Sequence, residues 1–162
     1  MENVVIRAAE ALADLTPLKT DCGKICGARC CSSLDGEETG MLLFPGEEAR
    51  FRDLAGWRLQ DTGRGILAIC PGACDRALRP LACRFFPLLP VLRQGRIRVA
   101  PDQRARACCP LFRQGLRGMD PAFVEAVRLA GEILALDARQ RAFLEALTGE
   151  QDELRALRRQ LL

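Results

Sequence analysis

Residues 70–87 decide the fold, and they read CPGACDRALRPLACRFFP from Cys70 to Pro87. This stretch places Cys70, Cys74 and Cys83 among turn-forming proline and glycine and ends in an apolar run. The chain contains six further cysteines in two tight groups on either side, namely Cys22, Cys26, Cys30 and Cys31 before it and Cys108 and Cys109 after it. Because neighbouring thiolates at such spacings can reach one ion, we expect the middle of the chain to fold around one or two metal centres.

The composition is that of a soluble globular protein, with 49% hydrophobic and 28% charged residues in a chain of 162. We expect one domain over residues 1–162, with a cysteine-rich metal-binding core at about residues 20–110 and a helical C-terminal part at about residues 119–162. The N-terminus has no signal-peptide pattern, and the apolar run 85–92 is far too short to span a bilayer. We therefore expect a cytoplasmic protein with no membrane partner.

The available side chains restrict the metal. Disulfides are rare in the cytoplasm, and nine cysteines cannot all pair with one another. With no histidine in the chain, a transition-metal site needs thiolate ligands, and the choice between Zn2+ and an iron–sulfur cluster (a [4Fe-4S] cluster if iron) stays open. The alternatives for the cysteines are a disulfide or thiol redox system and simple burial as small apolar side chains.

The predicted ligands are Cys22, Cys26, Cys30, Cys31, Cys70, Cys74, Cys83 and Cys109. Four thiolates suffice for one zinc ion or one cubane cluster, so this set allows one centre or two. The side chains of adjacent cysteines diverge, which leaves open which member of each adjacent pair, Cys30–Cys31 and Cys108–Cys109, binds metal.

Hydrophobic periodicity and turn residues predict a small α+β domain, in which short hairpins and cysteine-rich loops surround the metal between an N-terminal helix and C-terminal helices. We expect helices at residues 4–15 and 45–54, a strand at 41–44, and hairpins that pair 57–60 with 65–69 and 91–93 with 96–99. Asp120 and Pro121 begin a further helix. Gly149 is expected to separate a helix at 137–147 from one at 150–161, in which Leu154, Leu157 and Leu161 share a face.

Ten arginines and a single acid, Asp102, occupy the segment from Arg76 to Arg117. Such a segment can bind a polyanion, or its cations can balance the negative charge of metal-bound thiolates. The chain uses arginine almost everywhere in place of lysine and has one tryptophan and no tyrosine, which argues against nucleic-acid binding. We expect Arg79 and Arg84, which flank Cys83, to donate hydrogen bonds to the centre.

The cysteine pattern resembles the YkgJ-like cysteine-cluster family of zinc- or iron-chelating domains over about residues 20–110. The first group matches that family's Cys-x-x-Cys-x-x-Cys-Cys cluster except for its three-residue gaps, and the sequence Arg79-Pro80-x-x-Cys83-Arg84 matches its Arg-Pro-x-x-Cys-Arg element. Glu47 or Glu48 stands where the family has an acid at the start of a helix. The resemblance implies metal chelation, and a similar domain occurs in flagellin lysine N-methylases.

Three hypotheses of function follow. The first is a metal-binding protein whose zinc or iron–sulfur centre has a structural, redox or metal-handling role. The second is an iron–sulfur enzyme related to protein lysine N-methylases, although the chain shows no catalytic constellation and no nucleotide-binding glycine motif, which favours a non-enzyme. The third is an arginine-rich module that binds a partner or nucleic acid. The sequence identifies neither a substrate nor a protein partner.

Overall fold

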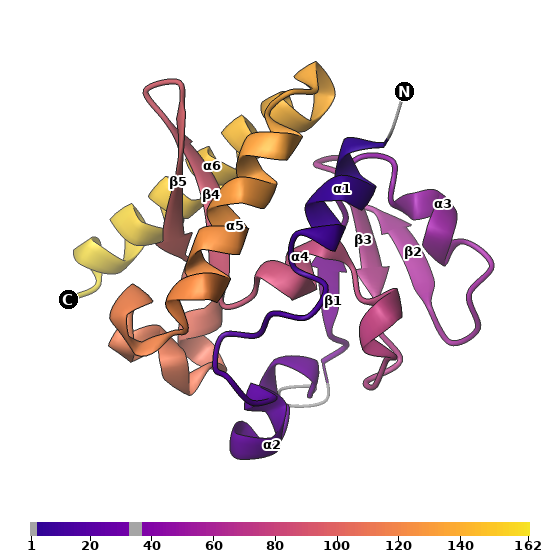
Figure 1. The fold of residues 1–162 in the computed structure, drawn as a ribbon, viewed down its shortest axis with the longest axis horizontal. Helices are drawn as coiled ribbons and strands as arrows, with labels where there is room; N and C mark the ends of the chain where they lie inside the picture. Colours follow the sequence, from indigo (N-terminus) through magenta and orange to yellow (C-terminus); the bar gives the residue numbers. More distant parts are fainter. Residues whose placement is uncertain (1–2, 33–36) are drawn as a thin grey trace.

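Short helices and strands follow one another from α1 to η5, and two longer helices complete the C-terminal end of the fold (Figure 1). The computed structural model describes residues 3–32 and 37–162. In chain order the elements are α1 (Val4–Glu10), α2 (Cys22–Cys26), η1 (Arg29–Cys31), β1 (Gly40–Leu42), α3 (Glu48–Phe51), β2 (Arg58–Asp61), β3 (Ile66–Ile69), η2 (Arg76–Leu78), α4 (Leu81–Phe85), β4 (Leu88–Arg93), β5 (Arg96–Pro101), η3 (Gln103–Ala107), η4 (Pro110–Gln114), η5 (Leu116–Gly118), α5 (Pro121–Leu134) and α6 (Ala138–Gln160). The predicted α+β class is confirmed.

The strands β1, β3 and β2 form an antiparallel sheet with β3 in the centre. Gly40 of β1 and Arg58 of β2 both lie opposite Ile69, the last residue of β3. The predicted hairpin between residues 57 and 69 is therefore confirmed, and the chain leaves the central strand directly into Cys70. A small core of Leu43, Phe51 and Ala68 joins α3 to this sheet.

A second hairpin pairs β4 with β5, from Leu88 opposite Pro101 to Arg93 opposite Arg96. Its turn residues Gln94 and Gly95 both have positive φ, 50° and 73°, as the two central positions of a type I′ turn require. This hairpin was predicted at residues 91–93 and 96–99. In the structure both strands are longer on the side away from the turn, since β4 begins at Leu88 and β5 ends at Pro101.

The helix α5 begins as predicted, because the Asp120 carboxylate accepts the Ala122 backbone N–H at 3.0 Å and Pro121 occupies the first helical position. Its residue Gly131 allows close packing on the hairpin: a Cβ there would lie 2.6 Å from Pro90 Cβ and 2.8 Å from Ile97 Cγ2. No described helix is both long and apolar enough to cross a membrane.

The predicted break at Gly149 is wrong, since α6 is one continuous helix that passes through this residue. Leu144 and Gln151 are buried on either side of it, so burial favours an uninterrupted helix over the modest local cost of glycine. The face that Leu154, Leu157 and Leu161 are predicted to share stays largely uncovered, with Leu157 and Leu161 56% and 85% exposed.

Two predicted N-terminal helices are shorter than expected. The helix α1 ends at Glu10 and continues only as turns, although Val5, Ala8 and Leu12 are buried along the predicted stripe. In the segment 45–54, only α3 is helical. The preceding residue, Glu47, accepts the backbone N–H groups of Phe44 and Leu81 at 2.9 Å each, so its buried carboxylate joins the loop before α3 to the first turn of α4.

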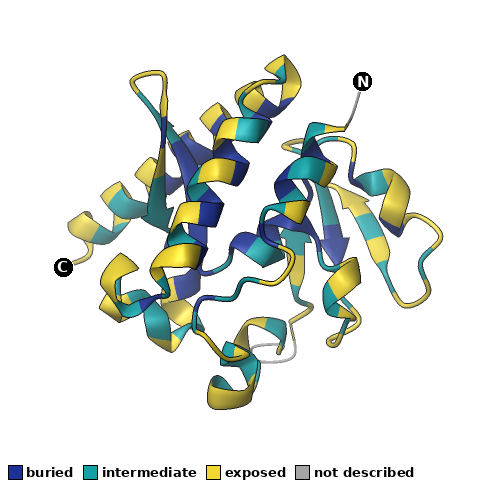
Figure 2. Ribbon diagram, in the orientation of Figure 1, coloured by how far each residue is buried: buried dark blue, intermediate teal, exposed yellow. Residues whose placement is uncertain are grey.

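The main apolar core connects both ends of the chain (Figure 2). Phe44, at the end of the first sheet, packs edge-on against Phe85 of α4 and Phe143 of α6, with ring centroids 5.7 and 5.1 Å apart. No cysteine belongs to this core or to the smaller one. The apolar cores therefore contain none of the residues predicted to bind metal.

Candidate metal centre

All nine cysteines lie on the walls of two adjoining cavities. The first cavity has a volume of about 400 Å³, and its cysteines are Cys22, Cys26, Cys30, Cys83, Cys108 and Cys109. The second cavity has a volume of about 80 Å³, and its cysteines are Cys30, Cys31, Cys70, Cys74 and Cys83. The structure thus brings together every predicted ligand from three distant segments, and Cys108 with them.

Local helix geometry places two cysteines on the same side of the first cavity. Cys22 and Cys26 stand four residues apart at the two ends of α2, so their side chains share one helix face. Asp21 caps the helix by accepting the Gly23 N–H at 3.0 Å, and Gly27 ends it with a φ of 68°. These two signals fix the short helix between the cysteines.

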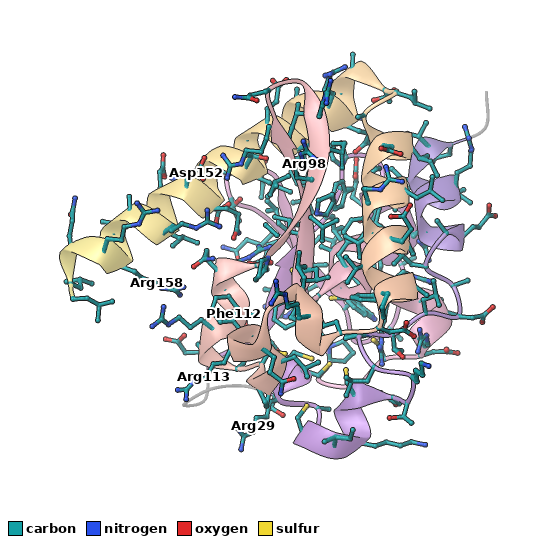
Figure 3. All side chains as sticks on the ribbon, turned by 60° about the vertical axis from the view of Figure 1, so that its left-hand side comes forward. Arg29, Arg98, Phe112, Arg113, Asp152 and Arg158 are labelled. Carbon is teal, nitrogen blue, oxygen red and sulfur yellow. The ribbon has the colours of Figure 1, made fainter. Side chains whose placement is uncertain are left out.

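The remaining wall of the first cavity comes from the junction of η3 and η4. Cys109 donates its backbone N–H to the Ala105 carbonyl at 2.7 Å, and Pro110 then begins η4. Sulfur atoms are visible beside the segment that carries Phe112 and Arg113, above α2 (Figure 3). Residues 22–30 and 108–111 therefore face each other across one space.

The second cavity lies at the end of the three-stranded sheet. Cys70 directly follows β3, donates its N–H to the Thr39 carbonyl at 2.9 Å, and accepts the Gly72 N–H at its sulfur at 3.4 Å. Cys74 comes from the loop after β3, and Cys83 from the middle of α4. Strand, loop and helix thus direct three of the nine sulfurs toward Cys31 at the end of η1.

The adjacent pair Cys30 and Cys31 stands at the boundary between the cavities. Cys31 lines only the second cavity, whereas Cys30 lines both. Their sulfur atoms are 4.0 Å apart, and all nine cysteines are free thiols. The two sulfurs are therefore in contact, and the predicted divergence of the side chains is not observed, although the pair borders both spaces.

Burial disfavours the charged form of several of these thiols. It raises the pKa of Cys22, with smaller contributions from Cys26 and Cys109, and it raises the pKa of Cys74 as well. Burial and the nearby sulfurs of Cys31 and Cys74 raise the pKa of Cys83 to about 12. Because protonated thiols are poor ligands, a metal ion that binds here must displace protons.

Two arginines near Cys83 have different roles. Arg79 lines both cavities. Burial alone would lower the pKa of its guanidinium, but a hydrogen bond to the Cys74 thiol and the nearby sulfur of Cys31 outweigh burial, so the pKa is raised. Arg84 instead donates to the carbonyls of Arg79 and Ala77, at 3.3 and 2.9 Å. The expected donor role beside the sulfurs therefore suits Arg79, while Arg84 holds the loop.

The sulfurs surround the cavities without converging on one point. Within residues 3–32 and 37–162, no three cysteine, aspartate or glutamate side chains are close enough together to hold a metal ion. Binding at either cavity therefore needs the thiols to move from the positions that they have in this structure. The ligand set remains a prediction.

No family model, curated protein or solved structure matches this chain. The resemblance to the cysteine-cluster family thus has no support beyond its motif residues.

Sequence reasoning missed the apolar part of the first cavity. Leu12, Leu15 and Leu111 line it together with Ile25, a large side chain that is 70% exposed in α2. One signal was present in the sequence, because Ile25 is the single large apolar residue in an otherwise polar cysteine group. Its neighbours in the cavity come from segments far away in the chain, and only the fold reveals them.

Proposed function

We propose that this protein binds metal through clustered cysteine thiolates, as zinc or as an iron–sulfur cluster. The observation that supports the proposal is the gathering of three cysteine groups from separate segments, residues 22–31, 70–83 and 108–109, around two adjoining cavities. Thiolates without histidine are the ligands of structural zinc and of iron–sulfur clusters. The resemblance to zinc- or iron-chelating domains agrees with this chemistry.

Burial argues against cysteines that act only as small apolar side chains. Unpaired structural cysteines are among the most completely buried residues in proteins. Here Cys30 is exposed and the other eight are only partly buried, and none contributes to the apolar cores. A thiol at a cavity wall is accessible to an ion, which suits a ligand better than a core residue.

The role that fits best is local stabilisation combined with metal or redox handling. The five-residue helix α2 provides no side chain to either apolar core. Isolated helices of this length are unstable in water, so contacts elsewhere must hold it. Metal bonds from Cys22 and Cys26 would supply such contacts.

The test is the metal and acid-labile sulfide content of protein purified without oxygen, together with its absorption spectrum. We expect either zinc without colour or iron with stoichiometric sulfide and a broad thiolate-to-iron band in the visible region. Protein that contains neither metal, and that takes up neither after reduction of all nine thiols, would contradict the proposal.

The size of the first cavity favours an iron–sulfur enzyme as the second candidate. Its volume of about 400 Å³ falls in the range of small-molecule sites, and apolar side chains line it beside arginine. An iron–sulfur centre there would have space for a substrate at its edge. Equilibrium binding of S-adenosylmethionine to iron-loaded protein tests this candidate, and absence of binding by calorimetry would leave the methylase resemblance without support.

A further inference from the structure

The two cavities divide the cysteines into two nearly separate sets. Four cysteines line the first cavity alone, namely Cys22, Cys26, Cys108 and Cys109. Three line the second cavity alone, namely Cys31, Cys70 and Cys74. Only Cys30 and Cys83 border both spaces, so their positions decide how the sets are completed.

The neighbours of Cys83 assign it to the second set. The thiols with the largest electrostatic effect on it are those of Cys31, Cys74 and Cys70, and all three line the second cavity. The Cys30 sulfur lies 4.0 Å from that of Cys31, but the other thiols with the largest electrostatic effect on it, Cys22, Cys108 and Cys26, all line the first cavity. The second set then has four thiols and the first has five.

We propose that the protein holds two distinct thiolate metal centres, an open one at the first cavity and a closed one at the second. The open centre takes its ligands from Cys22, Cys26, Cys30, Cys108 and Cys109, and the closed centre takes Cys31, Cys70, Cys74 and Cys83. This inference rests on the proposed function and specifies it, since metal binding alone requires only one centre.

The volumes and the wall residues explain why the two centres differ. The second cavity, at about 80 Å³, corresponds to only two or three water molecules. Four thiolates around one ion there complete a tetrahedral shell with no free position. The first cavity is about five times larger, has one thiol more than a tetrahedral ion needs, and borders the exposed side chains of Ile25 and Arg29.

The adjacent pair Cys30–Cys31 links the two centres. With one of these residues in each thiol set, consecutive backbone positions belong to different centres. Their sulfur atoms are separated by 4.0 Å. The segment η1 therefore couples the larger cavity to the smaller one.

Coordination gives the two centres different kinetics of metal loss. A chelator has room to bind at the open centre in the first cavity, whereas at the closed centre it has to displace a thiolate from a complete tetrahedral shell. We expect zinc-loaded protein to contain two Zn2+ per chain and to release them to excess 4-(2-pyridylazo)resorcinol in a fast and a slow phase of equal amplitude.

Two double variants show which centre gives the fast phase of zinc release and which gives the slow phase. The double variant Cys22→Ser/Cys26→Ser leaves three thiols at the first cavity, and we expect it to lose one Zn2+ and the fast phase. The double variant Cys70→Ser/Cys74→Ser leaves two thiols at the second cavity and should lose one Zn2+ and the slow phase. The matched controls are Lys24→Ser and Ala73→Ser, at exposed positions of the same segments, which should keep both ions.

The outcomes separate this inference from the proposed function. One Zn2+ per chain, released in a single phase and lost in either double variant, would mean one shared centre, so the inference would be overturned while metal binding stands. A wild-type chain that takes up neither zinc nor iron would overturn both. The release kinetics of the wild type decide the number of centres even if a double variant does not fold.

Discussion

Replacing Glu47 by alanine should destabilise the fold by about 3 kcal/mol, because one buried carboxylate makes two backbone hydrogen bonds. Its two oxygens accept the N–H groups of Phe44 and Leu81, each at 2.9 Å, and the residue is 1% exposed. The bonds connect the end of the first sheet to the start of α4. This helix carries Cys83, so the same carboxylate also positions a predicted ligand.

The magnitude follows from the two donors. An unsatisfied buried N–H costs about 1–3 kcal/mol, so alanine at position 47 would cost about 2–6 kcal/mol for Phe44 and Leu81 together. Removing the carboxylate recovers part of this cost, because the protein no longer has to bury an ionisable group. A net loss of about 3 kcal/mol is the result expected from denaturant unfolding.

Glutamine at position 47 shows how much one of the two hydrogen bonds contributes without the other. Its single oxygen can accept one N–H, but its NH₂ group then faces the other donor. We expect Glu47→Gln to lose about half as much stability as Glu47→Ala. The control is Glu48→Gln, because Glu48 is the neighbouring residue and its side chain is less buried. This substitution should change the free energy of unfolding by less than about 0.5 kcal/mol.

The pH dependence provides a second measurement on the same variants. Burial raises the pKa of the Glu47 carboxyl, and the N–H groups of Leu81 and Phe44 only partly oppose this. With a native pKa above the ordinary value of about 4.3, the folded state binds the proton more tightly than the unfolded chain does. The stability that Glu47 contributes is therefore complete below about pH 4.3 and falls as the pH rises through the native pKa.

The assay is urea unfolding of wild type, Glu47→Ala, Glu47→Gln and Glu48→Gln at several pH values between 4 and 8. The free-energy difference between wild type and Glu47→Ala should shrink as the pH increases. Two results would refute the reasoning: a cost of Glu47→Ala below about 1 kcal/mol at every pH, or a glutamine variant as stable as wild type.

Three further predictions use the same unfolding assay. Gly131→Ala should destabilise by about 1–2 kcal/mol, because its Cβ would lie 2.6 Å from that of Pro90 and the gain in helix propensity only partly offsets this overlap. Gly149→Ala, with nothing within 4 Å of the added methyl, should instead stabilise α6 by about 0.5–1 kcal/mol, and equal effects at the two glycines would contradict the packing argument. Gln151→Ala should cost about 2–4 kcal/mol, since its buried amide accepts the Gln103 N–H at 2.7 Å and donates to Asp102 at 3.2 Å, whereas a cost below about 1 kcal/mol would show that water replaces both bonds.

Sequence reasoning succeeded where the local chemistry is decisive. The pair Gln94–Gly95 specifies its turn because both residues adopt positive φ, and Asp120 followed by Pro121 specifies a helix start. The position of Cys70 at the end of a strand follows from the hairpin before it. These features depend on a few consecutive residues, so the sequence contains all the information that they need.

Prediction failed where distant packing overrides a local preference. Gly149 is a poor helix residue, yet α6 continues through it because side chains before and after it are buried against the hairpin and η3. Leu157 and Leu161 have helical spacing, but no other element covers them and they remain exposed. The spacing of apolar residues predicts a helical face and does not tell whether the fold provides a partner for it.

The candidate site has some features that follow from the local sequence and others that depend on distant packing. The cysteine groups are evident from spacing alone, but the contact between the sulfurs of Cys30 and Cys31 is not. The division into two cavities depends on how β3, α4 and the η3–η4 junction meet, which no local pattern contains. For this reason the number of centres stayed open in the sequence and becomes a specific proposal only with the fold.

The distribution of apolar residues supplies the strongest physical argument for a ligand at these cavities. Both apolar cores exclude α2 and η1, and Ile25, the largest apolar side chain of α2, is mostly exposed. Segments this short gain too little from their own hydrogen bonds to remain ordered without other contacts. The structure nevertheless places their cysteines beside those of β3, α4 and the η3–η4 junction. Thiolate bonds to a shared ion, as proposed above, would be strong enough to replace the missing apolar contacts.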